Sequence, residues 1–377
     1  MKVCHIITKP ELGGAQLSTL SLLKNLPKDK YELSIITSSR GTIKDDFERL
    51  LGVKVFMLLL LVRHINPILD ILVSINIWLI YITHKYDIVH THSSKAGILG
   101  RFTAKLAGVQ HIYHTVHGWP FNDYQNLFIK KVYILLERIC SLFTEKIICV
   151  SNSDIDLGLK HKIAPKEKFI LIKYGIDLAR FKNNTTDVSS KRRELGILNN
   201  DPIVGMISCL KPQKSPQDYI KASLDIYKNI DKVNFLLIGD GRLRPLCEKL
   251  LKDSSLDVRF KMLGWRRDIK EIIDLMDISI LTSKWEGLPM AVIESLVKGC
   301  VVVATDTGGV RELVRDGETG FITKKGNPSE IASRVVYLLK DIEQLDAMKN
   351  KAKASMDDSF CISRMVKDTD LLYRGVN

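Results

Sequence analysis

Two glutamates close to a predicted strand end are the first residues whose types and spacing suggest chemistry. The apolar run Ile278–Leu281 predicts a buried strand. A helix is predicted from Pro289 to Val297, since proline is tolerated in the first turn of a helix. Glu286 lies in the loop between them and Glu294 inside the helix. Unpaired amides at a helix start bind anions, so this segment would suit a polyhydroxylated ligand carrying phosphate. A solvated loop glutamate and an ordinary surface-helix glutamate explain the same spacing equally well.

Further positions at predicted strand ends could contact such a ligand. Gly13 and Gly14 follow the first strand, where absent side chains let backbone amides approach an anion. Lys214 follows another apolar run and could neutralise a phosphate, although a solvated loop lysine would give the same pattern. His117 ends a strand, where a packed structural histidine is the commoner role. Neither Gly13-Gly14 nor the segment 239–241 completes a dinucleotide fingerprint, so a nicotinamide-dependent dehydrogenase is not supported.

Strands and helices alternate along the chain, which indicates parallel sheets covered by helices on both faces. A polar, asparagine-rich segment from Lys182 to Asn200 interrupts this alternation, which then restarts. We therefore expect an α/β fold with two doubly wound, Rossmann-like domains that face a central cleft. The expected domains cover 1–183 and 184–355, and a helix within 356–377 returns to the first. Predicted strands begin at residues 3, 32, 53, 87, 110, 146 and 168, and then at 203, 234, 258, 278, 301 and 320.

Composition indicates a folded protein with an anionic partner. The 377 residues, 45% of them hydrophobic, are enough for two domains of ordinary size. Seven cysteines without CxxC spacing predict neither a disulfide framework nor a zinc site, so we expect a reducing, cytoplasmic location. The first apolar run is too short for a signal peptide. The net charge is +13, but the basic residues are too dispersed for nucleic acid. Phosphorylated substrates or an anionic membrane surface explain this charge equally well.

One apolar stretch, from Pro67 to Thr83, needs a separate interpretation. No charged residue occurs between Ile71 and Ile82, yet the run is shorter than the ~20 residues of a membrane span. A helix of a Rossmann layer normally has a polar outer face, and here only Asp70, Ser74 and Asn76 interrupt the apolar surface. Two interpretations stay open: a helix deeply covered by the protein, or a helix lying in a membrane interface.

Taken together, these motifs resemble those of the retaining glycosyltransferases of family 4, which have the GT-B fold. The likeness spans nearly the whole chain, and its most specific element is the Glu-x7-Glu motif of Glu286 and Glu294. The other matching segments are Gly13-Gly14-Ala15-Gln16, His90 to Gly97, His114 to Trp119, Val150-Ser151-Asn152, Gly175-Ile176-Asp177, Lys214, Gly264-Trp265 and Thr307-Gly308-Gly309.

The resemblance implies a nucleotide-sugar site in the second domain. Glu294 would bind the ribose hydroxyls, and Lys214 would bind the diphosphate. Glu286 would hold the donor sugar together with its loop, and the backbone around Trp265 and Arg266 would face the base. The residues of that loop are Gly287, Leu288 and Pro289.

The resemblance also implies that the first domain takes the acceptor. The loop of Gly13 and Gly14 would approach the diphosphate from this side, and His117 would contact the transferred sugar. His117 and Glu286 are therefore the predicted catalytic residues, and Lys95 is the candidate for an acceptor phosphate.

Two positions depart from the family pattern. Cys209 stands where an arginine is usual, five residues before Lys214, so one phosphate partner is missing. Lys211 could substitute, although an ammonium cannot reproduce bidentate guanidinium binding. Tyr174 replaces the usual asparagine before Gly-Ile-Asp.

The implied activity is transfer of a hexosyl or N-acetylhexosaminyl group, with retention, from a UDP-sugar to a lipid-linked saccharide. Such an enzyme would serve surface polysaccharide or glycan synthesis at the inner face of the cell membrane. No cofactor or metal is expected, because Lys214, helix-start amides and the glycine loop would stabilise the leaving diphosphate. Two alternatives remain: a UDP-sugar epimerase of the same fold, and a catalytically silent nucleotide-sugar-binding protein, which Cys209 suggests.

Overall fold

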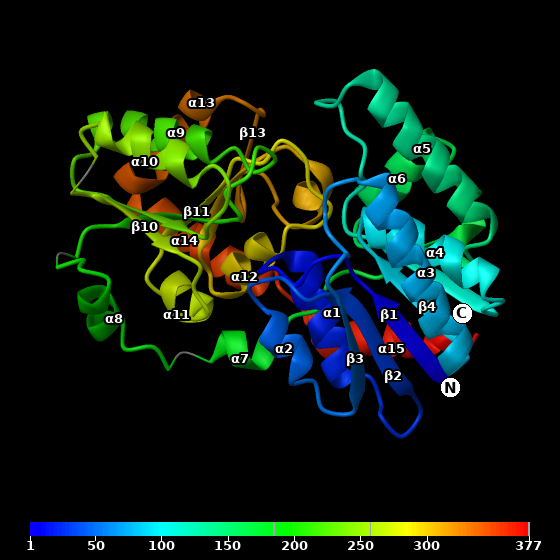
Figure 1. Cartoon of the computed structure of the whole chain (residues 1–377). Helices are drawn as coiled ribbons and strands as arrows, with labels where there is room; N and C mark the ends of the chain where they lie inside the picture. Colours follow the sequence, from blue (N-terminus) through cyan, green and yellow to red (C-terminus); the bar gives the residue numbers. More distant parts are fainter. Residues whose placement is uncertain (184, 199, 257, 376–377) are drawn as a thin grey trace. The chain divides into compact units, whose positions relative to one another are not determined.

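The computed structural model describes residues 1–183, 185–198, 200–256 and 258–375, and the chain divides into two compact units (Figure 1). Unit 1 comprises 1–176 and 361–377, and unit 2 comprises 177–360. We expected the first domain to end at residue 183, but unit 2 already begins at Asp177. The reason is that Phe181 packs into the core of unit 2. The C-terminal segment belongs to unit 1 from Cys361 onward, and not from residue 356 as expected. At this return, the Ile362 amide donates to the Ile176 carbonyl at 3.0 Å.

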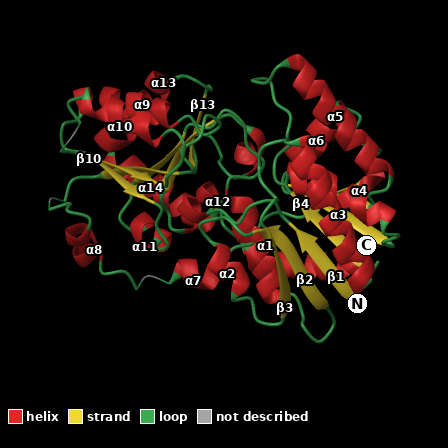
Figure 2. Ribbon diagram, in the orientation of Figure 1, coloured by secondary structure: helices red, strands yellow, loops and turns green. Residues whose placement is uncertain are grey.

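Unit 1 contains a seven-stranded parallel sheet in the order β3-β2-β1-β4-β5-β6-β7. Figure 2 labels its first four strands, β1 to β4. The chain runs outward from β1 to β3 and then starts β4 on the other side of β1. The carboxyl ends of β1 and β4 therefore flank the topological switch point, where ligands of such sheets bind. The strands are β1 (Lys2–Ile6), β2 (Glu32–Ser38), β3 (Val53–Leu58), β4 (Ile88–His92), β5 (His111–Val116), β6 (Lys146–Cys149) and β7 (Phe169–Leu171).

Helices cover both faces of this sheet, because successive strand residues point to opposite faces. Val3 and Ile88 pack with residues of α1 and α15, whereas Cys4 and Val89 pack with residues of α3 and α4. The helices are α1 (Gly14–Asn25), α2 (Lys44–Glu48), α3 (Pro67–His84), α4 (Ser94–Leu106), α5 (Leu127–Leu142), α6 (Asn152–Lys160) and α15 (Ile362–Tyr373).

Unit 2 contains a six-stranded parallel sheet in the order β10-β9-β8-β11-β12-β13, with its switch point between β8 and β11. The strand expected from Val258 begins at Phe260 instead, and Val258 is 85% exposed. The strands are β8 (Ile203–Ile207), β9 (Asn234–Ile238), β10 (Phe260–Gly264), β11 (Ile278–Leu281), β12 (Val301–Thr305) and β13 (Gly320–Thr323). The helices are α7 (Leu178–Lys182), α8 (Val188–Glu194), α9 (Pro216–Asn229), α10 (Arg244–Lys252), α11 (Ile269–Ile273), α12 (Met290–Val297), α13 (Pro328–Lys340) and α14 (Ile342–Ala354).

The apolar stretch after Asn66 forms α3, and its burial decides between the two interpretations of a covered and an exposed helix. By length and composition, α3 alone among the described helices could cross a membrane. Only Val73, Ile77 and Tyr81 are buried, and they pack in the core of unit 1. Most of the other apolar side chains face outward; Ile68, for example, is 73% exposed. The interpretation as a deeply covered helix is therefore wrong.

Candidate active site

Two loops that carry predicted donor residues of unit 2 meet at its switch point. One loop joins β8 to α9, and the other joins β11 to α12. Thr282 Oγ1 donates to the carbonyl of Lys214 at 2.8 Å, and the Lys284 amide donates to the carbonyl of Gln213 at 2.8 Å. These hydrogen bonds hold the Lys214 turn against the start of the Glu-x7-Glu segment.

Lys214 and Glu286 form an ion pair between these loops. Lys214 Nζ lies 2.5 Å from Glu286 Oε1, and Ser283 Oγ donates to the same oxygen at 2.6 Å. The glutamate side chain is only 7% exposed, so each charge depends on the other for compensation. A diphosphate could take over the ammonium while a sugar hydroxyl takes over the carboxylate, which is the chemistry that a sugar diphosphate requires.

The glycine motif of 307–309 seats the Glu286 loop. Gly309 donates its amide to the Gly287 carbonyl at 2.7 Å. Gly308 has φ +48°, and a Cβ there would lie 2.1 Å from the backbone oxygen of Glu286. Only glycine allows this approach. Leu288 and Pro289 are buried in the same loop.

Glu294 lies on α12, which begins at Met290 with Pro289 as its N-cap, one residue later than predicted, since Pro289 has a non-helical ψ of 109°. Within the described residues, the Glu294 carboxylate has no hydrogen-bond or ion-pair partner. Burial raises its pKa to about 7. Glu294 is only partly exposed. A carboxylate with a raised pKa and without a partner in its own chain is typical of functional sites, because a structural carboxylate is normally paired or solvated. Ligand hydroxyls could donate to it.

The loop with the unusual Cys209 packs on the loop that follows β9. The Leu210 amide donates to the Asp240 carbonyl at 2.9 Å. Gly239 has φ +124°, and a Cβ there would lie 1.9 Å from the Ser208 carbonyl oxygen, so this glycine serves loop packing. Lys211 lies in the same turn as the lysine of the ion pair, whose amide donates to the Lys211 carbonyl at 2.9 Å.

Arg266 is engaged within unit 2. Its guanidinium contacts Asp268 at 2.5 Å and Glu194 at 2.6 Å, and these hydrogen bonds raise its pKa above the usual value. Trp265 beside it is partly exposed. The base contact predicted here would therefore come from Trp265 or from backbone, and not from the guanidinium.

In unit 1, two predicted residues lie at the switch point, at the carboxyl ends of β1 and β4. Gly13 is the N-cap of α1, and no side chain caps that helix, so its first amides can face an anion, as predicted for the loop of Gly13 and Gly14. Lys95 is the second residue of α4. Its ammonium pairs with Asp70 of α3 and donates to the His64 carbonyl at 2.6 Å. An acceptor phosphate at Lys95 would have to displace these partners.

The ring of His117 is held on both sides within unit 1. Nδ1 lies 2.7 Å from the Tyr174 hydroxyl, and Nε2 lies 3.1 Å from His92 Nδ1. Burial lowers the pKa of His117 to about 3, so the ring is neutral at physiological pH. The unusual Tyr174 thus completes the hydrogen bonding of the predicted catalytic histidine. A sugar that bonds to the ring would replace one of these two partners.

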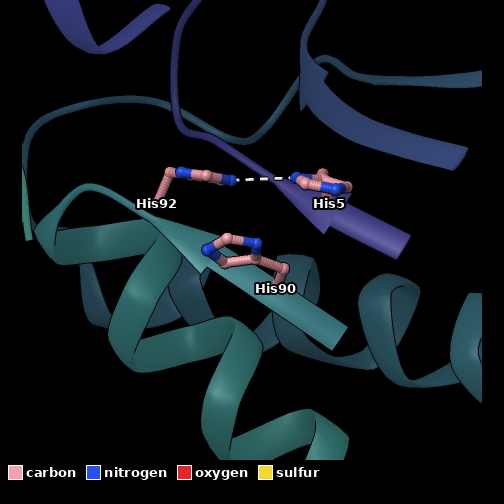
Figure 3. A group of neighbouring side chains, drawn as sticks. All are labelled: His5, His90 and His92. Atoms are coloured by element: carbon pink, nitrogen blue, oxygen red, sulfur yellow. Dashed lines mark hydrogen bonds between the residues drawn. The ribbon is translucent and has the colours of Figure 1, made fainter. Parts of the chain in front are cut away.

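Three buried histidines, His5, His90 and His92, form a cluster in unit 1 (Figure 3). His92 joins this cluster to His117. Their potential metal-ligating atoms lie within 4.8 Å of one another. However, His5 Nδ1 and His92 Nε2 are hydrogen-bonded to each other at 3.0 Å, and both nitrogens of His90 bond to hydroxyls. A metal would have to break these bonds, so we interpret the cluster as a hydrogen-bonded network. We did not predict it; the signal was His90-Thr91-His92, which puts two histidines on one sheet face, with His5 paired to His90.

Comparison with known proteins agrees with this geometry. The family model described as Glycosyltransferase Family 4 matches residues 12–180, and that described as Glycosyl transferases group 1 matches 187–355. An Escherichia coli protein, UDP-Gal:alpha-D-GlcNAc-diphosphoundecaprenol alpha-1,3-galactosyltransferase, is 31% identical over 376 residues, which cover 99% of this chain and 96% of that protein. The chain belongs to glycosyltransferase family 4.

Other relatives agree with the family and the fold. The N,N'-diacetylbacillosaminyl-diphospho-undecaprenol alpha-1,3-N-acetylgalactosaminyltransferase of Campylobacter jejuni is 28% identical over 306 residues, which cover 77% of this chain and 78% of that protein. Among solved structures, Anabaena HepE in complex with UDP-glucose superposes over the full length of both chains with a TM-score of 0.84 at 21% identity. The protein is thus a glycosyltransferase with the GT-B fold, as the sequence predicted.

Proposed function

We propose that this glycosyltransferase moves a sugar, with retention of configuration, from a UDP-sugar to a lipid-linked saccharide during synthesis of a surface polysaccharide or glycan. The observation that carries the proposal is Glu294, a partly exposed carboxylate with a raised pKa and no partner among the described residues, on the helix that follows the Lys214–Glu286 pair. The E. coli relative is named for a UDP-linked donor, and both named relatives for acceptors on diphosphoundecaprenol, which supports the substrate classes.

The proposed reaction uses electrostatic stabilisation and needs no metal. The bond from the anomeric carbon to the diphosphate oxygen breaks, and a bond from that carbon to the acceptor oxygen forms on the same face. The acceptor proton passes to the leaving diphosphate. Within unit 2, Lys214 and the first amides of α12 would stabilise the negative charge that develops on this diphosphate. Glu286 would orient the sugar.

The outer surface of unit 1 supports a peripheral location on an anionic membrane. Helices α3 and α5 both pack on α4 (Figure 1), and a buried ion pair of 2.7 Å between Arg101 of α4 and Glu137 of α5 fixes one of these contacts. Both outer helices expose apolar side chains, among them Ile68 (73%), Ile71 (62%), Ile75 (49%), Leu127 (73%), Phe128 (74%), Leu135 (55%) and Leu142 (78%).

A lipid-linked acceptor would explain why α3 and α5 expose so many apolar side chains. Exposed apolar side chains gathered on neighbouring helices mark interaction sites in soluble proteins. A lipid-linked acceptor stays in the bilayer, so an enzyme that acts on it gains by resting on the surface. Lys130, Lys131 and Arg138 lie on α5 among the exposed apolar residues. Each basic residue near anionic lipid contributes ~1 kcal/mol to binding.

Vesicle flotation tests the membrane part of the proposal. The wild type should float with anionic vesicles, and salt should weaken this binding. The triple variant Ile75→Ser, Trp78→Ser, Leu79→Ser on α3 should lose it. A control with Leu198→Ser and Val258→Ser changes residues of unit 2 that are 86% and 85% exposed, and it should float like the wild type. If the triple variant keeps its circular dichroism spectrum and still floats fully, α3 is not the membrane anchor.

Incubation with a panel of UDP-sugars tests the catalytic part. With a lipid-linked saccharide present, mass spectrometry should show the acceptor heavier by one sugar. A new UDP-sugar formed without any acceptor would instead identify an epimerase. Tight donor binding with no product in either condition would identify a catalytically silent protein.

A further inference from the structure

A linear series of side-chain hydrogen bonds, called the file below, runs through unit 1 between its sheet and helix α15. Strand alternation places His5, His90, His92 and Thr115 on the same face, and Tyr373 of α15 covers them. The bonds join Tyr174 Oη to His117 Nδ1 (2.7 Å), His117 Nε2 to His92 Nδ1 (3.1 Å), His92 Nε2 to His5 Nδ1 (3.0 Å), His5 Nε2 to Tyr373 Oη (3.1 Å), Tyr373 Oη to His90 Nδ1 (2.5 Å) and His90 Nε2 to Thr115 Oγ1 (2.6 Å).

Hydrogen counting restricts the file to two arrangements. Burial lowers the pKa of all four histidines, so each ring is neutral, with one nitrogen that donates and one that accepts. If Tyr174 donates to His117, every later bond has the same direction and all four rings carry their proton on Nε2. If the direction is reversed, all four carry it on Nδ1.

A mixed arrangement fails at Tyr373. Its hydroxyl has one hydrogen, so it can donate to only one of its two histidine neighbours. If both neighbours donated to Tyr373, its own hydrogen would have no partner in the file, and a buried donor left unpaired is unfavourable. The two halves of the file are therefore coupled through this one hydroxyl.

We propose that Tyr373, His5 and His92 are positioning residues for His117, and that the file they form gives all four histidines one shared tautomer. The link to catalysis rests on the proposed function and on the contact between His117 and the transferred sugar that the family resemblance implies. When a sugar hydroxyl takes the place of Tyr174 at Nδ1 of His117, the bond to His92 stays. The sugar hydroxyl then donates to the ring in the Nε2-protonated tautomer and accepts from it in the Nδ1-protonated tautomer. A ligand that selects one tautomer of His117 thereby selects the direction of the whole file, as far as α15.

Both directions are compatible with the surroundings of the file. A cavity of about 20 Å³ is lined by several of its members, including Thr115, His117 and Tyr174. This volume accepts one water molecule, which could accept from Thr115 Oγ1 when that hydroxyl receives the hydrogen bond of His90. The choice between the directions is thus left to the group that binds at His117.

Histidine tautomers can be read directly by long-range ¹H–¹⁵N NMR of protein labelled at histidine. Single His→Gln variants assign the signals, and His114 is the internal reference. It is buried and bonds to Thr91 Oγ1 at 2.8 Å, outside the file. We expect His5, His90, His92 and His117 to show one tautomer at neutral pH. Two different tautomers among these four would overturn the proposal.

Tyr373→Phe removes the bridging hydroxyl and keeps the ring. We expect the His5 and His90 signals to lose their match, the His117 signal to shift, and kcat to fall about tenfold, the loss expected for one positioning hydrogen bond, with UDP affinity unchanged. Tyr113→Phe is the matched control, because its hydroxyl bonds to Glu145 and to the Leu372 carbonyl, outside the file. An unshifted His117 signal in folded Tyr373→Phe would overturn the proposal.

A second variant covers the case in which Tyr373→Phe does not fold. Thr115→Val removes the last hydroxyl of the file and keeps the β-branched shape. It should shift the His90 signal and, through the file, that of His117; a shift confined to His90 would overturn the proposal. The NMR result needs no substrate. A shared tautomer in a protein without transferase activity would therefore refute the proposed function and leave the file intact.

Discussion

Binding of a UDP-sugar should weaken as the pH falls below about 7, because Glu294 must be ionised to accept two ribose hydroxyls well. Burial raises its pKa to about 7. A protonated carboxyl group has lost part of its accepting capacity and all of its charge. The intact UDP-sugar is the right probe, since both of its phosphates are esterified and its own charge stays constant in this range.

The size of the effect follows from the ionised fraction of Glu294. With a pKa of about 7, this fraction is roughly 3% at about pH 5.5 and roughly 90% at about pH 8, so the Kd should rise about thirtyfold on acidification. Glu294→Gln removes the ionisation and should give a flat profile. At about pH 8 the variant should bind roughly ten- to hundredfold more weakly, because hydrogen bonds to a charged acceptor contribute ~1.5–3 kcal/mol.

The raised pKa of Glu294 also predicts how the folding stability depends on pH. Ionisation of Glu294 favours ligand binding but lowers the stability of the folded protein. Burial raises the pKa of Glu294 from 4.5 in its ordinary state to about 7 in the folded protein. The folded state therefore binds more protons between these values, and stability falls as the pH rises from about 4.5 to about 7. The loss is on the order of 2–3 kcal/mol. Glu294→Gln should avoid it and melt at a higher temperature than the wild type at neutral pH.

Titration calorimetry across the pH range, in buffers of different ionisation enthalpy, measures both the affinity and the protons released on binding. We expect close to one proton released per UDP-sugar at about pH 6, and none for Glu294→Gln. A wild-type affinity that does not change with pH, or an equal slope in the Gln variant, would remove Glu294 from the donor site.

Glu286→Ala should lower turnover strongly while UDP, which lacks the sugar, still binds nearly normally in calorimetry; a parallel loss of UDP affinity would contradict the role. Cys209→Arg should be tolerated and should tighten donor binding, because it adds a guanidinium for the diphosphate. Lys211→Ala should then weaken the wild type more than the Cys209→Arg variant, and equal losses would show that Lys211 does not substitute. In denaturant titrations, Arg101→Met should cost about 3–5 kcal/mol, because it leaves Glu137 buried and unpaired, whereas Arg101→Met with Glu137→Leu should recover much of this loss.

The fold and the meeting of Lys214 with Glu286 were predictable from the sequence. Alternating strands and helices dictate parallel sheets, and residues that follow strands beside a switch point must lie at one sheet edge. The contact between the two loops is therefore a consequence of strand order. The desolvation of Glu294 was not predictable, because it depends on how closely the neighbouring loops pack around α12.

Other features depend on partners that no local pattern reveals. Lys95 was the candidate for an acceptor phosphate, but Asp70 on a different helix already pairs with its ammonium. The His117 network needs Tyr373 from the far end of the chain and the register of β1 against β4. The sequence did not predict an exposed apolar surface on α5. The outward-facing residues of this helix can be identified only once its contact with α4 is known.

The most direct test of the proposed reaction is NMR of the product formed from an α-linked UDP-sugar and a synthetic lipid-linked saccharide, recorded from the first turnovers. The account predicts that the anomeric proton of the transferred sugar shows the α configuration and that UDP is released in equal amount. A β-linked product would contradict the retaining mechanism. UDP release without growth of the acceptor would contradict the assignment of a lipid-linked saccharide as the sugar's destination.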